Sequence, residues 1–186
     1  MASTYTDNTG IEKPGAGEQS GTWGTTTNTN FDIIDRSLNG VGAITLSGTT
    51  HTLSTSDGST SDGHYRVLVL GGTPSGTNTI TISPNDQDKV YLVYNNTSQS
   101  AVFSQGSGSN ATITAGTTAW IYADGAGSGA AVRAVPSDLV DDASPQLGGN
   151  LDVNGNSIVS VSNGDIAITP DGTGDVIIDG IKYPQA

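Results

Sequence analysis

Short apolar blocks separated by turn-forming residues fill the middle of the chain, from Ala43 to about Val135. The separators are rich in Asp-Gly, Gly-Gly, Asn-Asn and Pro, residues that set turn geometry. Apolar blocks about 8–12 residues apart with turns between them are typical of strands in a sandwich. We therefore expect residues 43–135 to form an antiparallel β-sandwich or jelly-roll-like domain. The expected strands are 44–46, 50–53, 65–70, 79–82, 90–94, 101–103, 111–113, 119–122 and 131–133.

The N-terminal 42 residues follow a different pattern. Residues 1–30 are polar, which indicates either an extended arm that becomes ordered only against a partner or a disordered terminus. Next, Phe31, Ile34 and Leu38 recur at i, i+3 and i+7 between an N-cap candidate, Asn30, and an Asn-Gly stop, so a short helix is predicted there. Residues 1–42 are thus interpreted as an attachment arm with one short helix.

Trp23 is a large aromatic ring in this polar segment, and such rings often anchor interfaces. We expect Trp23 and the helix face formed by Phe31, Ile34 and Leu38 to be buried against another subunit or another protein. These four residues are the candidate docking residues.

The character of the chain changes again after the sandwich. Residues 136–150, with two prolines and several Asp and Gly, indicate a linker. Residues 151–186 carry thin apolar strands, predicted at 151–153, 158–161, 165–168 and 176–178, with too few apolar side chains to bury a core alone. Identical copies wound about one axis would supply the missing core, and we expect a trimer. The side chains expected at the axis are Ile158, Val161, Ile166, Ile168, Val176 and Ile178.

Charge and composition exclude several classes of protein. The formal net charge is −12, and nucleic-acid or anionic-membrane binding needs a basic surface instead. No cysteine is present, which excludes disulfides and thiol catalysis. No apolar run approaches the ~20 residues of a spanning helix, and no signal-peptide pattern begins the chain.

Catalytic and metal-binding patterns are weak. His51 and His64 lie in Thr/Ser/Gly-rich surroundings, and no Gly-x-Ser-x-Gly elbow presents a nucleophile. The Gly-rich segment 125–130 is followed by no expected helix, so it is interpreted as a hairpin loop. Alternating Asp residues near 86–88 and 171–175 lack the closing Glu of a calcium loop. We predict no enzyme activity, no catalytic residue, no cofactor and no metal.

Strand-borne Tyr91, Tyr94, Trp120 and Tyr122 alternate as core residues would. Sugar-binding sites stack their ligands on exposed rings, and this pattern leaves few rings for that purpose. A carbohydrate-binding module is therefore the second hypothesis and not the first.

Two stretches resemble structural fibre proteins of tailed bacteriophages, especially those of marine hosts. The N-terminal stretch contains YTDNTG at 5–10, GEQSGTWGTTTN at 17–28 and NFD at 30–32. The second stretch resembles the entry into tail-fibre shafts and contains DDASPQLGGNLD at 141–152, NGN at 154–156 and ITPDGTG at 168–174.

The resemblance implies a virion protein, in first place a tail fibre, whose residues 1–42 attach to tail or head structural proteins and whose residues 151–186 begin a homotrimeric β-rich shaft. The sandwich would then be a non-catalytic spacer or docking module, and a distal part of the fibre would contact a host surface glycan. The alternatives are a carbohydrate-binding adhesion module, a head fibre and a capsid decoration protein.

Overall fold

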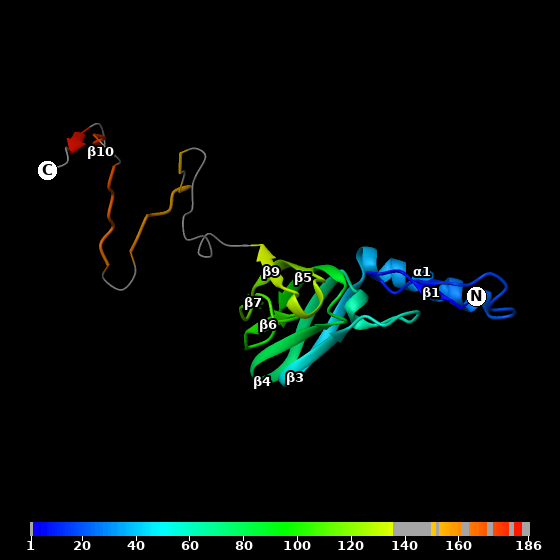
Figure 1. The fold of residues 1–186 in the computed structure, drawn as a ribbon. Coiled ribbons are helices and arrows are strands. Elements are labelled where there is room, and N and C mark those ends of the chain that lie inside the picture. Colours follow the sequence, from blue (N-terminus) through cyan, green and yellow to red (C-terminus); the bar gives the residue numbers. More distant parts are fainter. Residues whose placement is uncertain are drawn as a thin grey trace. The chain divides into compact units, whose positions relative to one another are not determined.

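A computed structural model describes residues 2–135, 150–151, 153–160, 164–170, 173–178 and 181–183. The chain divides into two compact units, residues 1–143 and residues 144–186. In the first unit the described residues form a small hairpin, one α-helix and a seven-stranded sheet (Figure 1). The prediction of a mainly β protein with a short helix near its N-terminus is confirmed.

The N-terminal segment folds onto its own chain. Strands β1 (Thr4–Tyr5) and β2 (Glu12–Lys13) form an antiparallel hairpin that lies beside helix α1 (Trp23–Asn39). The helix starts eight residues before the expected Phe31, so Asn30 lies inside it and is not its N-cap. Asn30 instead accepts a hydrogen bond from the Glu12 N–H (2.9 Å) and donates one to the Glu12 carbonyl (2.8 Å). This pairing stabilises a Thr-rich helical turn whose intrinsic helix propensity is low.

Two long strands, β3 (Val41–Ser54) and β4 (Val67–Ser83), run parallel, with one register shift between the pairs Gly48–Pro74 and Thr50–Thr79. The sequence pattern predicts two shorter strands in each, with a turn at Gly71–Pro74 in the second; that prediction is wrong, because each is one continuous strand. Within this pair, Gly72 has φ +91°, and a Cβ there would lie 2.3 Å from the Leu46 carbonyl oxygen. Only glycine fits this close, left-handed position.

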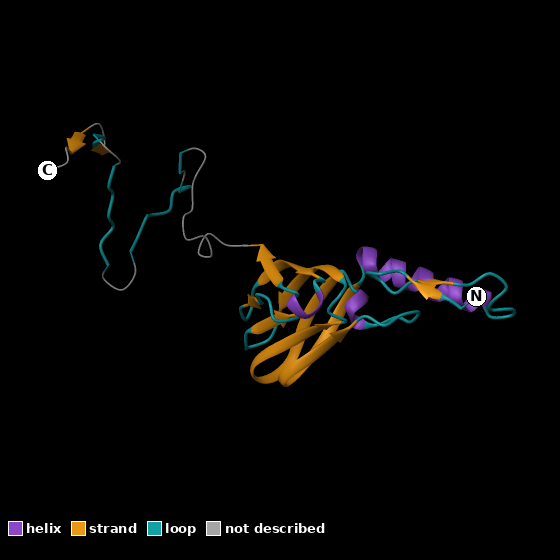
Figure 2. Cartoon of the chain, viewed as in Figure 1, coloured by secondary structure: helices purple, strands orange, loops and turns teal. Residues whose placement is uncertain are grey.

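The two halves of β4, before and after the register shift, pair with different strands. Val67–Leu70 pairs with β5 (Asp88–Asn95), and Asn78–Thr81 pairs with β6 (Ala101–Ser104), both in parallel. Antiparallel pairing adds β8 (Thr118–Asp124) and β9 (Val132–Val135) beyond β5, and β7 (Ala111–Ile113) beyond β6. Short 3-10 helices occur at Asp62–His64 (η1) and Gly127–Gly129 (η2). The sheet thus folds over into two layers (Figure 2).

The prediction of a purely antiparallel sandwich is wrong for the β3–β4, β4–β5 and β4–β6 pairs. Parallel neighbours normally need a long crossover connection. Here the sheet folds back on itself, so β3 ends close to where β4 begins. In the same way, β4 ends close to where β5 begins (Figure 2). Loops 55–66 and 84–87 therefore suffice, and the sequence pattern of strand and short turn looks antiparallel.

One core lies between the layers, and every strand of the seven-stranded sheet contributes to it. The largest side chains under 2% exposed are Tyr91, Phe103, Ile33, Leu46, Leu53, Leu68, Leu70, Ile80, Ile82, Ile113, Ile121 and Val93. Of the four aromatic residues expected in the core, only Tyr91 lies there. Tyr94, Trp120 and Tyr122 point to the outside of the sheet, which corrects that prediction.

In the second unit, β10 (Val176–Ile178) and β11 (Ile181–Tyr183) form an antiparallel pair. The predicted strand at 176–178 is therefore present. The described residues of 151–153, 158–161 and 165–168 form no strand, which corrects those three predictions. A strand needs a neighbour for its N–H and C=O groups, and a single chain supplies none there.

Candidate functional site

Helix α1 carries an exposed apolar stripe, defined by the four candidate docking residues Trp23, Phe31, Ile34 and Leu38. At 3.6 residues per turn these side chains project within about 80° of one another. Trp23 is 64% exposed, Phe31 61% and Leu38 65%, while Ile33 alone on the helix is buried. The fold of the single chain therefore brings all four together on one helix face and leaves that face uncovered.

The neighbouring face of α1 is occupied by the N-terminal hairpin. Asn30 holds Glu12 from this face, and the Gln19 side chain donates a hydrogen bond to the Glu12 carboxylate. The arm was expected to become ordered only against a partner. The structure corrects that expectation, because residues 2–22 pack on α1 and on the sandwich.

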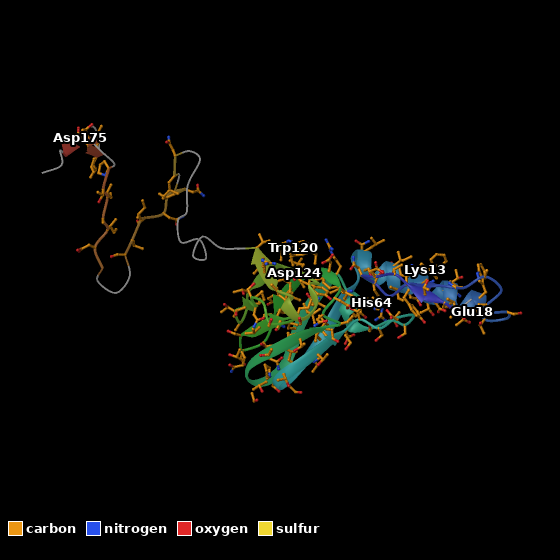
Figure 3. The ribbon with its side chains drawn as sticks, viewed as in Figure 1. Lys13, Glu18, His64, Trp120, Asp124 and Asp175 are labelled. Carbon is orange, nitrogen blue, oxygen red and sulfur yellow. The ribbon has the colours of Figure 1, made fainter. Side chains whose placement is uncertain are left out.

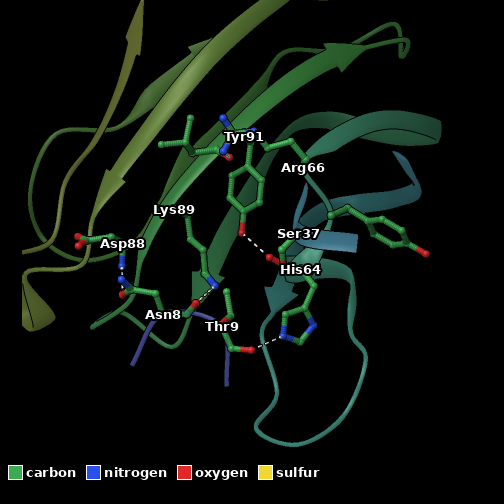
Figure 4. Close-up of a pocket in the computed structure, with 11 residues that line it drawn as sticks. Asn8, Thr9, Ser37, His64, Arg66, Asp88, Lys89 and Tyr91 are labelled. Atoms are coloured by element: carbon green, nitrogen blue, oxygen red, sulfur yellow. Dashed lines mark hydrogen bonds between the residues drawn. The ribbon is translucent and has the colours of Figure 1, made fainter. Parts of the chain in front are cut away.

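The turn of the hairpin packs against the sandwich, and its Asn8 and Thr9 line a small pocket there together with His64, Lys89 and Tyr91 (Figure 4). Asn8 accepts a hydrogen bond from the Asp88 N–H (3.2 Å) through its side chain and one from the Lys89 ammonium through its carbonyl. The Gly10 carbonyl accepts from the Gly58 N–H at 2.7 Å. Gly10 has φ +59°, and a Cβ there would lie 2.7 Å from Asp57 Oδ1, so this contact requires glycine.

His64, at the end of η1, completes the dock where the arm meets the sandwich (Figure 3). Its Nδ1 accepts a hydrogen bond from the Ser61 N–H (3.0 Å), so this nitrogen carries no proton. Nε2 is then the protonated nitrogen and donates to the Thr9 carbonyl at 2.9 Å. Nδ1 is thus engaged by Ser61 of its own loop and Nε2 by the arm, an arrangement that suits a structural group better than an acid–base catalyst.

The electrostatics of this pocket favour neutral His64. Burial lowers the pKa of His64 below its ordinary value, and the positive charges of Lys89 and Arg36 act in the same direction. Burial also lowers the pKa of Lys89, to about 8. Buried Tyr91, whose hydroxyl donates to the Gly63 carbonyl at 2.8 Å, has its pKa raised by burial.

Acidification is expected to loosen the hairpin from the sandwich. A proton on Nδ1 removes the acceptor for Ser61 and adds a charge beside Lys89 and Arg36. Because the pKa of docked His64 lies below 6.5, the undocked state binds the proton first, and docking weakens as the pH falls below about 6.5, by up to about tenfold per pH unit. Hydrogen exchange of the peptide spanning residues 2–22, corrected for the intrinsic rate, measures this between about pH 7.5 and 5.

His64→Leu serves as the test variant and His51→Leu as its matched control. The first is expected to exchange faster at neutral pH and to lose the pH dependence, and the second to keep it. An unchanged pH dependence in His64→Leu would show that another group controls docking.

A polar hollow of about 610 Å³ lies at another part of the arm–sandwich junction and is lined by Tyr5, Asp7, Asp57, Asp86 and Gln87, among others. Within the described residues, no group of three or more His, Cys, Asp or Glu side chains is arranged to hold a metal ion. The Asp86 and Asp88 pair from the sequence analysis is thus not extended by a third such ligand.

The side chains expected at a trimer axis belong to the second unit. Ile158, Ile166, Ile168 and Ile178 are exposed and Val176 is half-buried, whereas Val161 lies outside the described residues. The structure of one chain does not bring them together. Leu151, Val159 and Ile177 are exposed in the same unit, so apolar side chains without a core recur along it.

No helix among the described residues is long and apolar enough to cross a membrane. Comparison with protein-family models, with curated proteins and with solved structures gives no match for this chain.

Proposed function

We propose that this chain is a structural subunit of a bacteriophage fibre, in first place a tail fibre, that assembles as a homotrimer on the virion. The observation that carries the proposal is the apolar stripe of α1. Phe31, Ile34 and Leu38 have the a/d spacing with which identical helices pack in a coiled coil. Packing against copies of the same helix would bury this seam.

The N-terminal region would also attach the fibre to a tail or head structural protein. Support comes from the resemblance of residues 5–32 to the attachment region of phage fibres. Trp23 lies at the first turn of α1, one helix length away from the sandwich, and is a suitable anchor there.

The second unit would begin the fibre shaft. Its described apolar side chains are almost all exposed in one chain, and three chains wound together would cover them. The resemblance of residues 141–174 to shaft entries supports the same assignment.

We expect no catalytic activity. Both ring nitrogens of His64 are hydrogen-bonded, Nδ1 to Ser61 of the sandwich and Nε2 to Thr9 of the arm. His51 Nε2 is buried without a hydrogen-bond partner, so no carboxylate orients that ring through this nitrogen for catalysis. Neither histidine is therefore arranged as an acid–base catalyst, which agrees with a structural role.

A carbohydrate-binding module remains the second candidate, because Tyr94, Trp120 and Tyr122 are exposed on one sheet face. Exposed rings are the usual platform for sugars. The carbohydrate-binding module ranks second because the side chains beside Trp120 are the apolar Leu92 and Val135.

Immunogold electron microscopy with an antibody raised against this chain tests the proposed function on particles of the phage that encodes it. Gold on a fibre of the tail is the expected result, and serum pre-absorbed with the purified chain is the control. Particles free of gold, with the chain accumulating apart from them in the lysate, would contradict a role in the virion. Gold on the capsid would favour the head-fibre alternative.

A further inference from the structure

The outer face of one sandwich layer is apolar across five strands. In the register of the sheet, Val41, Val67, Leu92, Trp120 and Val135 form one continuous row from β3 to β9. Ala43, Val69 and Tyr94 continue it on one side, where that row ends at Thr118, and Val90 and Tyr122 on the other, where that row ends at Arg133. We call these ten residues the apolar sheet face.

The other layer provides an internal comparison. Its corresponding row is Thr50, Thr79, Val102 and Thr112, from β3 to β7, and the next row begins with Thr52 and Thr81. A sheet face in contact with water normally alternates with the core in this way, polar outside and apolar inside. The same fold therefore has one outer face suited to water and one that resembles a core layer.

The charges around the apolar sheet face have the arrangement of an interface. The register pair Asp88 and Asp124 lies at one end of it, where Asp124 and Arg133 form an ion pair of 2.8 Å. No carboxylate lies among the ten residues, although the chain carries 18 acidic residues. An apolar centre with charges at its rim is the anatomy of protein–protein contacts.

The apolar sheet face begins three residues after the apolar stripe of α1 ends. Leu38, the last member of the stripe, is followed after Asn39 and Gly40 by Val41, the first member of the row. The junction is fixed, because the Arg66 N–H donates to the carbonyls of both Arg36 and Gly40. A contact along the helix and a contact on the sheet face would therefore lie next to each other in the chain.

The exposed area suits a stable contact. From the exposed fractions, on the order of 500 Å² of apolar side chain lies on the sheet face and a similar area on the stripe, compared with ~800 Å² per partner in a standard interface. With a net charge of −12, copies repel elsewhere, and the carboxylate-free face is where they approach at least electrostatic cost.

A sugar platform fits these observations less well. The Arg66 guanidinium lies 5.4 Å from the Trp120 ring centroid and covers one side of the indole. The register neighbours of Trp120 are Leu92 and Val135, which offer no hydrogen bond to a hydroxyl group.

We infer that the apolar sheet face is a second contact between copies of this chain, buried in the same assembly that buries the stripe of α1. The inference rests on the proposed self-assembly and extends it from the helix to the sandwich. The sandwich is then part of the trimer interface and not a spacer between contacts.

Single cysteines in the cysteine-free chain test this inference. Val90→Cys, on the central strand β5, reports on the apolar sheet face, and Thr112→Cys, on β7, reports on the polar layer. Both side chains are exposed in the single chain. In the assembled full-length chain, Val90→Cys is expected to react with a maleimide at least about tenfold more slowly than Thr112→Cys. Dissociation at low protein concentration should remove the difference.

Light scattering on the same samples separates the two proposals. A trimer in which Val90→Cys reacts as fast as Thr112→Cys would overturn the sheet-face contact and leave assembly through α1 intact. A monomer with both thiols reactive would overturn assembly as a whole. If Val90→Cys reacts rapidly with the maleimide and only added host polysaccharide slows the reaction, the contact between copies is overturned in favour of a sugar platform.

Discussion

Glutamate at both Phe31 and Leu38 is expected to convert the assembled chain into monomers. Each of these side chains contributes about 1.5–3 kcal/mol when buried, and an unpaired carboxylate in an apolar seam adds a desolvation penalty. The association constant should therefore fall at least about a thousandfold. Sedimentation velocity or light scattering at micromolar concentration measures the change.

The matched control places the same two charges elsewhere on α1. Thr25→Glu with Asn39→Glu alters two exposed positions outside the stripe and should leave the assembly unchanged. Because Phe31 and Leu38 are exposed in one chain, the sandwich of the first variant should keep its far-UV circular dichroism and its urea midpoint. Trimers that persist in that variant would show that α1 is not the seam.

Truncation of Phe103 is expected to have the largest effect on folding stability. Phe103 is 0% exposed and lies in the core between the two layers. Phe→Ala at such a position costs about 3–5 kcal/mol, a large part of the ~5–15 kcal/mol that stabilises a typical domain. Urea unfolding followed by tryptophan fluorescence measures the loss.

The chain offers its own control, because Phe31 is its other phenylalanine and is exposed. At a concentration where the chain is dissociated, Phe31→Ala should change the free energy of unfolding of the sandwich by less than about 0.5 kcal/mol. Equal losses in the two variants would mean that the core is not where the structure places it.

The sequence predicted strands best where one face is buried and turns are local. Strands β5, β6, β7 and β8 lie where apolar blocks indicated them. The long parallel pair was missed because the sequence Gly71–Pro74 inside β4 looks like a turn, and parallel pairing depends on contacts far apart in the sequence. The first half of α1 was missed because Thr25 to Thr29 favour helix only weakly, and it is the Asn30–Glu12 contact that supports it.

The helix part of the candidate site was readable, since Phe31, Ile34 and Leu38 repeat at helical spacing. The sheet face was not recognised, although a signal was present. Val90 to Tyr94 is an unbroken apolar run, which is typical of a strand covered on both faces. Alternation alone could not tell which of Tyr91 and Tyr94 points inward. The arm dock joins Thr9 to His64 across 55 positions and has no local pattern at all.

The bent pair of β3 and β4 has a consequence for mechanical load. Helix α1 ends at Asn39 and β3 begins at Val41, so tension on the N-terminal region pulls β3 along its own axis. Hydrogen bonds between strands lie across that axis and are loaded in shear. The register from Val41–Val67 to Gly48–Pro74 is uninterrupted, so these bonds resist together instead of opening one after another. A force that would open the hydrogen bonds of a terminal hairpin one by one is resisted here by all the bonds between these parts of β3 and β4 together.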